Sequence, residues 1–154
     1  MSTVDKSEFA ATFIELQQLL IDFGREIDLN EARNITDFFE EDGSWVLNGT
    51  AYRGHAGVRQ FHDDRAKRLR GMYPDGVPLS RHTFTNQRLS MAGETATFEF
   101  MAFYYTGAGT AQVPDEIAKT MVVDNRMQCR RNAAGEWRIS IVESKQILYR
   151  NEST

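Results

Sequence analysis

The sequence predicts an α+β fold in which helices cover one face of a curved, mixed or antiparallel sheet. The first half of the 154-residue chain carries apolar residues at helical spacing, whereas the period changes to two after residue 80. The second half also contains two hairpin signals, AGE at 92–94 and NAAG at 132–135. Helices and strands are therefore segregated along the chain, as in α+β domains. No repeat or linker interrupts the chain, so we expect a single domain over 1–154.

Three helices are expected, over 7–28, 30–39 and 55–70, with a strand and a short extended piece at 40–54 between the last two. Gly71 is placed to end the third helix. The first helix has the clearest apolar stripe, which consists of Phe9, Phe13, Leu16, Leu20 and Ile27.

Four strands are expected in the second half, as two hairpins. The first pairs 81–91 with 95–105, and the second pairs 119–131 with 136–150. The segment 106–118 would connect the hairpins. The sheet face away from the helices would meet solvent or a second copy of the chain, so a homodimer or homotrimer through this face is expected.

Composition excludes several classes of function. The chain has 18 basic and 22 acidic residues, and a net charge of −4 argues against nucleic-acid binding. Cys129 is the only cysteine, so no internal disulfide is possible. No stretch approaches membrane-spanning length, and we expect a cytoplasmic protein. His55 and His62 lie two helical turns apart and are interpreted as a solvated face rather than a metal site, and no cofactor is expected.

His82 is the one histidine on a predicted strand. If the first hairpin turns at residues 93–94, His82 faces Tyr105 and Phe84 faces Phe103 on one side of the sheet. The neighbouring strand would add Met121 to this face. The last strand would add Trp137, Ile139 and Ile141, followed by Glu143. Such a face, curved over helices, predicts a pocket lined mostly by carbon.

Asp28 is the second candidate for chemistry. It lies at the carboxyl end of the first predicted helix, where a carboxylate opposes the helix dipole and gains from a partner. A histidine is the natural partner, since the carboxylate fixes its tautomer and raises the basicity of its other nitrogen. A pair formed by His82 and Asp28 in an apolar pocket would be a general base able to remove a proton from carbon or from water.

Each candidate also has a structural interpretation. His82 alone is as well explained by a core histidine, and Asp28 by an N-cap of the second helix. Trp45 and Tyr105 are equally compatible with the core. Glu143 is either a cavity acid or, as we favour, the partner of an arginine.

The segments 28–61, 81–90 and 135–149 resemble the cone-shaped nuclear-transport-factor-2-like fold in its SnoaL-like branch. Within the branch the chain is most similar to the scytalone dehydratase and hexachlorocyclohexane dehydrochlorinase group. The resemblance implies a His–Asp pair that eliminates water or HCl, matched here by His82 and Asp28. It also implies an aromatic pocket residue on the first strand, matched by Trp45.

The chain departs from that group at two positions. Glu143 stands where the dehydrochlorinase has a cavity arginine, and no histidine follows on the next strand, where Tyr105 is the nearest group. The leading hypothesis is therefore a cofactor-independent lyase or isomerase acting on a small, apolar, cyclic molecule. The pair would serve as base, the pocket residues would position the substrate, and Tyr105 would donate to developing charge. The alternatives are a non-catalytic module that binds a hydrophobic ligand, or the small β-type subunit of a ring-hydroxylating dioxygenase.

Overall fold

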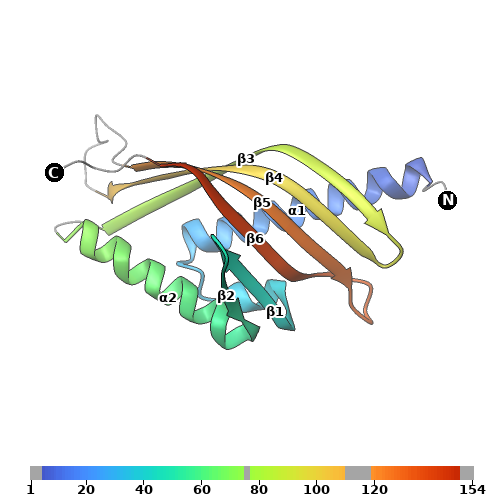
Figure 1. The fold of residues 1–154 in the computed structure, drawn as a ribbon, viewed down its shortest axis with the longest axis horizontal. Coiled ribbons are helices and arrows are strands. Elements are labelled where there is room, and N and C mark those ends of the chain that lie inside the picture. Colours follow the sequence, from blue (N-terminus) through green and yellow to red (C-terminus); the bar gives the residue numbers. More distant parts are fainter. Residues whose placement is uncertain (1–4, 75–76, 110–118, 150–154) are drawn as a thin grey trace.

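The computed structural model describes residues 5–74, 77–109 and 119–149 and has one mixed sheet of six strands (Figure 1). The strand order is β2-β1-β6-β5-β4-β3, and only the pair β1–β6 is parallel. The α+β class is confirmed. In chain order the elements are α1 (Lys6–Leu29), η1 (Ile35–Phe38), β1 (Phe39–Leu47), β2 (Thr50–Arg53), α2 (Gly54–Met72), β3 (Val77–Ala92), β4 (Thr95–Gly109), β5 (Lys119–Arg131) and β6 (Trp137–Tyr149).

Both helices cover the same face of the sheet. Figure 1 shows α1 running along the length of the sheet and α2 lying beside β1 and β2. Leu16, Leu20 and Phe23 of α1 belong to one buried cluster with Val58 and Phe61 of α2. The sheet contributes a row of inward side chains to this cluster, among them Phe98, Phe100, Met127, Ile139 and Val142. Apolar burial on this one face holds the two layers together.

The expected second helix over 30–39 is wrong, so the described residues form two α-helices rather than three. Only the single 3₁₀ turn η1 forms there, and β1 already begins at its end. Glu31 and Ala32 take left-handed backbone angles, with φ of 52° and 55°, which a right-handed helix cannot continue through. The Glu26 carboxylate accepts the backbone N–H of Asn34 at 2.6 Å and so fixes the chain just after α1.

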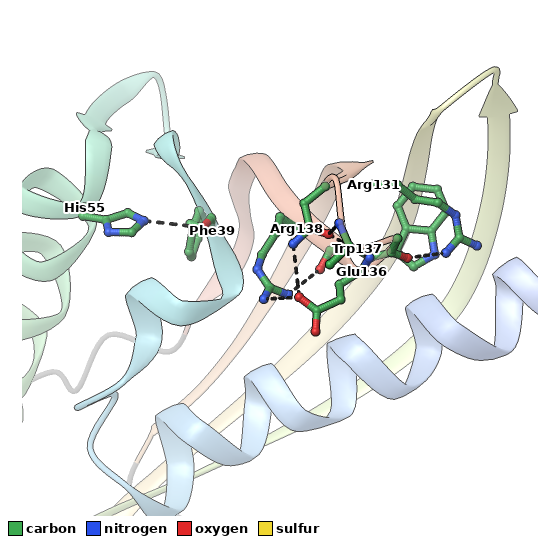
Figure 2. A network of polar contacts seen from close by, with 9 residues as sticks. Phe39, His55, Arg131, Glu136, Trp137 and Arg138 are labelled. Carbon is green, nitrogen blue, oxygen red and sulfur yellow. Dashed lines mark hydrogen bonds and ion pairs between the residues drawn. The ribbon is translucent and has the colours of Figure 1, made fainter.

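The hairpin between β5 and β6 is tied to α1 by polar contacts. Trp137 Nε1 and Arg131 both donate to the Glu15 carboxylate, at 2.8 and 2.7 Å. The Arg131 guanidinium lies over the Trp137 ring, 4.4 Å from its centroid. Figure 2 shows these two side chains beside the neighbouring pair of Glu136 and Arg138, whose charged atoms are 2.7 Å apart. These contacts anchor the amino-terminal half of α1 and leave its carboxyl end to form the candidate site.

Two sequence expectations bear on the remaining chain. Within the described ranges no helix combines the length and the hydrophobicity that a membrane crossing requires. The predicted connection 106–118 begins as part of β4, which reaches Gly109, and residues 110–118 lie outside the described ranges.

Candidate active site

A β-bulge in β3 decides which side chains face the helices. The first hairpin pairs Ala92 with Thr95, as expected, but the register shifts by one residue between Thr85 and Arg88. Asn86 lies in this interval with a positive φ of 53°. A bulge places two residues opposite one and turns the following side chains to the other face.

The bulge corrects the expected partners of the candidate histidine. His82 pairs with Tyr104 rather than Tyr105, and Phe84 pairs with Ala102 rather than Phe103. The inner face of β4 therefore carries Phe100, Ala102 and Tyr104, all buried. Phe103 and Tyr105 alternate with them and lie on the outer face of the sheet.

His82 and Asp28 meet directly. The Nδ1 atom of His82 lies 2.7 Å from Oδ1 of Asp28, and the backbone N–H of His82 donates to Oδ2 at 2.6 Å. Ser80 Oγ donates to Oδ1 at 2.9 Å. Both carboxylate oxygens of Asp28 thus accept hydrogen bonds from residues of β3. The interpretation of Asp28 as the N-cap of a second helix is wrong. Its side chain is 6% exposed and that of His82 is 16% exposed, so the pair is largely screened from water.

The protonation of the pair follows from these contacts. Burial raises the pKa of Asp28, but the hydrogen bonds and charge of His82 and the Ser80 hydroxyl outweigh it, and the net pKa is lowered. Asp28 is therefore a carboxylate near neutral pH and can only accept hydrogen bonds. His82 must then donate from Nδ1, and in its neutral form Nε2 carries the lone pair that can act as a base.

An apolar cavity of about 220 Å³ lies between the sheet and the helices, and His82 is part of its wall. Of the residues predicted to line a pocket, Trp45, Phe84 and Met121 do so. The structure does not bring Phe103, Tyr105 or Glu143 to the cavity. Glu143 pairs with Arg126 at 3.5 Å, in agreement with the favoured interpretation as an arginine partner. Phe23, Leu47, Phe100 and Val142 complete much of the apolar wall.

Tyr104 is the polar group next to the histidine. Its ring centroid is 4.7 Å from that of His82, and its hydroxyl accepts a hydrogen bond from Arg65 Nη2 at 2.8 Å. Burial is the largest influence on the pKa of Tyr104, and the net pKa is raised although Arg65 opposes the change. The hydroxyl therefore keeps its proton and can donate it to a hydrogen bond in the cavity. Sequence reasoning missed Tyr104 by one position, because the bulge cannot be read from the alternation of side chains.

His62 was also missed. The interpretation of a solvated face holds for the exposed His55, whose ring lies 3.4 Å from the Phe39 carbonyl oxygen (Figure 2), but it is wrong for His62. His62 is 2% exposed and lines the cavity. The spacing of His62 from Val58 and Leu69 could have indicated that it is buried, since helical positions four and seven apart share a face.

The family of the chain follows from comparison with known proteins. The model of the SnoaL-like domain matches residues 10–143. The chain belongs to the SnoaL-like domain family. A search of curated proteins gave no match for this SnoaL-like domain.

Solved structures resemble this SnoaL-like domain in fold. ActVI-ORFA from Streptomyces coelicolor is 18% identical with a TM-score of 0.71, covering 89% of this chain and 96% of that one. A hexachlorocyclohexane dehydrochlorinase, LinA type 2, is 15% identical with a TM-score of 0.73, covering 97% and 94%. An NTF2-like protein with a cystatin-like fold from Novosphingobium aromaticivorans is 21% identical with a TM-score of 0.65, covering 99% and 95%.

Proposed function

We propose that this SnoaL-like domain is a cofactor-independent lyase or isomerase that acts on a small, apolar, cyclic molecule. The observation that carries the proposal is the contact of 2.7 Å between His82 and Asp28 at the wall of an apolar cavity. A histidine whose tautomer is fixed by a buried carboxylate is a general base suited to neutral pH. The pair is placed where a substrate carbon can approach it and where bulk water is largely excluded.

The chemical step begins at His82. Nε2 takes a proton from a substrate carbon, and the electron pair of the C–H bond forms a new double bond. In a lyase the group on the neighbouring carbon leaves with its bonding electrons. A hydroxide leaving group takes the proton back from His82 to form water, whereas after loss of a halide the imidazolium releases its proton to solvent. In an isomerase the proton returns to a different carbon. Asp28 stabilises the positive imidazolium that exists between these steps.

Tyr104 would stabilise the negative charge that develops during the step. Its hydroxyl accepts from Arg65 and so keeps its own proton available for a leaving group or an enolate oxygen. The sequence predicts this role for Tyr105. We propose it for Tyr104 instead, because Tyr104 is the neighbouring residue whose side chain lines the cavity. The apolar rings of Trp45 and Phe84 would position the substrate against the base.

The solved structures agree with this proposal at the level of fold. One of them is named a hexachlorocyclohexane dehydrochlorinase. The name describes the removal of HCl from a cyclic substrate. At 15% identity this likeness supports the architecture. The chemistry is supported by the contacts of His82 in this chain.

The test compares His82→Ala with His55→Ala, which removes an exposed histidine that does not line the cavity. Both variants and the wild type are assayed against a panel of hydroxylated and halogenated cyclic compounds. We expect His82→Ala to lower turnover by about 10²–10⁴ and His55→Ala to leave it unchanged. Equal turnover in all three proteins would refute the base. Binding of panel compounds without turnover would favour a ligand-binding module, and co-purification of a larger iron-containing chain would favour a dioxygenase subunit.

We also propose that copies of the chain associate through the outer face of the sheet. Phe103 and Tyr105 lie there partly exposed, and Leu148 of β6, which pairs with Val122 opposite Phe103, is 63% exposed. Apolar side chains gathered on a sheet face favour association. We expect a homodimer or homotrimer by light scattering and a monomer for Phe103→Glu. A monomeric wild type at micromolar concentration would contradict this.

A further inference from the structure

Two buried polar side chains of the cavity wall have no hydrogen-bond partner in the part of the chain that the structure describes. Neither ring nitrogen of His62 has a partner among the described residues, although the residue is only 2% exposed. The indole Nε1 of Trp45 is also buried without one. A buried polar atom without a partner is unfavourable, so such atoms are rare and call for an explanation.

The two side chains form one cluster. The ring centroids of His62 and Trp45 are 4.9 Å apart, with the ring planes at 76°. His62 comes from α2 and Trp45 from β1, and both belong to the cavity wall that also contains His82.

Among the other polar side chains of the wall, Arg68 is exposed to solvent, whereas several buried or half-buried ones are already paired within the protein. Arg65 donates to Tyr104 at 2.8 Å. Ser144 donates to Asn125 at 2.7 Å. The buried polar atoms of the described wall that lack a partner are thus those of His62 on α2 and Trp45 on β1.

The charge state of His62 limits what it can bind. Burial, with smaller effects from the positive charges of Arg65 and Arg59, lowers the pKa of His62 well below its usual value. The imidazole is therefore neutral and has one N–H donor and one acceptor nitrogen, while the Trp45 indole can only donate. A ligand group that accepts from these donors suits the cluster, and the nearby arginines make a cationic group unfavourable.

We propose that His62 and Trp45 form a polar subsite that binds a neutral oxygen of the substrate, such as a ring carbonyl. This inference rests on the proposed function and narrows its substrate class, from an apolar cyclic molecule to an oxygenated one. One oxygen held at the α2 side fixes the orientation of the ring, so that a chosen carbon faces His82. Because the nitrogens of both rings are covered by neighbouring atoms, the His62 and Trp45 rings must turn slightly toward the cavity when the ligand binds.

Binding of two matched probes tests the subsite. The bicyclic ketone 1-tetralone and the hydrocarbon tetralin share a skeleton and differ in one carbonyl. Their dissociation constants are measured in the wild type, in His62→Phe and in the control His55→Phe. Comparing the ratio of the two constants between proteins cancels the different hydration of the probes. We expect the preference for 1-tetralone to fall on the order of tenfold in His62→Phe and to persist in His55→Phe. An unchanged preference in His62→Phe overturns the inference.

A measurement on the wild type covers the case in which His62→Phe does not fold. The chain has three histidines, so selective ¹⁵N labelling gives three imidazole rings to follow. We expect 1-tetralone to shift the ring nitrogens of His62 and the indole N–H of Trp45, and tetralin to leave them in place. The Trp137 indole, which donates to Glu15, is an internal reference. Equal responses of His62 to both probes overturn the inference.

Failure of the subsite and failure of the proposed function give different results. His82→Ala removes the base without touching the α2 side of the cavity. If this variant keeps the wild-type turnover, the proposed function fails, while the subsite is still judged by the probe ratio. If His82→Ala loses turnover but His62→Phe keeps the ketone preference, the base stands and the subsite is refuted.

Discussion

Replacing Asp28 by asparagine is the most informative change to the candidate site, because it alters protons and leaves the shape nearly unchanged. In the wild type, three groups donate to the carboxylate: His82 Nδ1 at 2.7 Å, the His82 backbone N–H at 2.6 Å and the Ser80 hydroxyl at 2.9 Å. An amide has only one oxygen, so it cannot replace both carboxylate oxygens, one of which accepts from His82 Nδ1 and the other from the His82 backbone N–H. The backbone N–H of His82 cannot change its role, and it will retain the amide oxygen.

The amide NH₂ of the Asp28→Asn variant then faces His82 Nδ1, which must become an acceptor. The imidazole proton moves to Nε2, the atom that would otherwise take a proton from the substrate. Loss of a general base lowers turnover by about 10²–10⁴, or roughly 3–5 kcal/mol in the barrier. The lost charge-assisted hydrogen bond also lowers the free energy of unfolding by about 1.5–3 kcal/mol.

The assay combines the tautomer of His82 with turnover. Long-range ¹⁵N–¹H spectra of histidine-labelled protein should show the proton on Nδ1 in the wild type and on Nε2 in Asp28→Asn. Ser80→Ala is the matched control, since it removes one hydrogen bond and keeps the carboxylate, and it should retain the wild-type tautomer. A wild-type proton on Nε2, or turnover in Asp28→Asn equal to that in Ser80→Ala, would refute the reasoning.

Three further predictions follow from the site. Tyr104→Phe should lower turnover about tenfold or more by removing the cavity hydroxyl, while Tyr105→Phe, one residue away on the outer face, should not; equal effects would contradict the bulged register. Because the pKa of His62 is depressed on folding, the unfolded chain binds the extra proton, so stability should fall below about pH 6.5 by up to roughly 1.4 kcal/mol per pH unit. His62→Phe should flatten that slope in urea titrations across pH, and an unchanged slope would argue against the buried neutral imidazole. A Cβ at Gly24 would lie 2.5 Å from the Phe84 ring, so Gly24→Ala should push that ring toward the cavity, destabilise the protein by about 1–3 kcal/mol and weaken probe binding, and unaltered binding would contradict this.

The acidic side of the stability profile depends on Asp28. Its pKa is lowered in the folded protein, so its stabilising effect is complete above the unfolded value of about 3.9 and is lost as the pH falls through the folded value. Acid titration of unfolding should therefore be less steep for Asp28→Asn than for the wild type. Identical acid profiles would show that the contacts of Asp28 add nothing to stability.

The long helices were predictable from the sequence because each has a continuous apolar stripe. The prediction of 7–28 corresponds to Lys6–Leu29, and that of 55–70 to Gly54–Met72. The short helix at 30–39 failed because hydrophobic spacing says nothing about backbone angles. Glu31 and Ala32 take left-handed angles in the segment between α1 and Asn34, whose backbone N–H is held by the Glu26 carboxylate.

The meeting of His82 with Asp28 was predictable, whereas the residues around it were only partly so. A carboxylate at the end of a helix and a histidine at the opening of a strand are both visible in sequence. The side of the sheet that each aromatic residue faces depends on counting from the turn, and the bulge at Asn86 adds one residue that alternation cannot reveal. His62 was misassigned because a polar side chain on a helix was taken to face solvent, although its spacing placed it with Val58.

The strand order carries a consequence for the carboxylate itself. β3 lies at the margin of the sheet, and the amide of His82 points away from β4 toward Asp28 Oδ2. An unpaired backbone N–H on an edge strand can pair with a strand from another molecule. The Asp28 carboxylate prevents this pairing at His82 because it already accepts that N–H. Asp28 would therefore protect the protein from aggregation even in a relative that had lost its histidine, and an aspartate at this position alone is no sign of an enzyme.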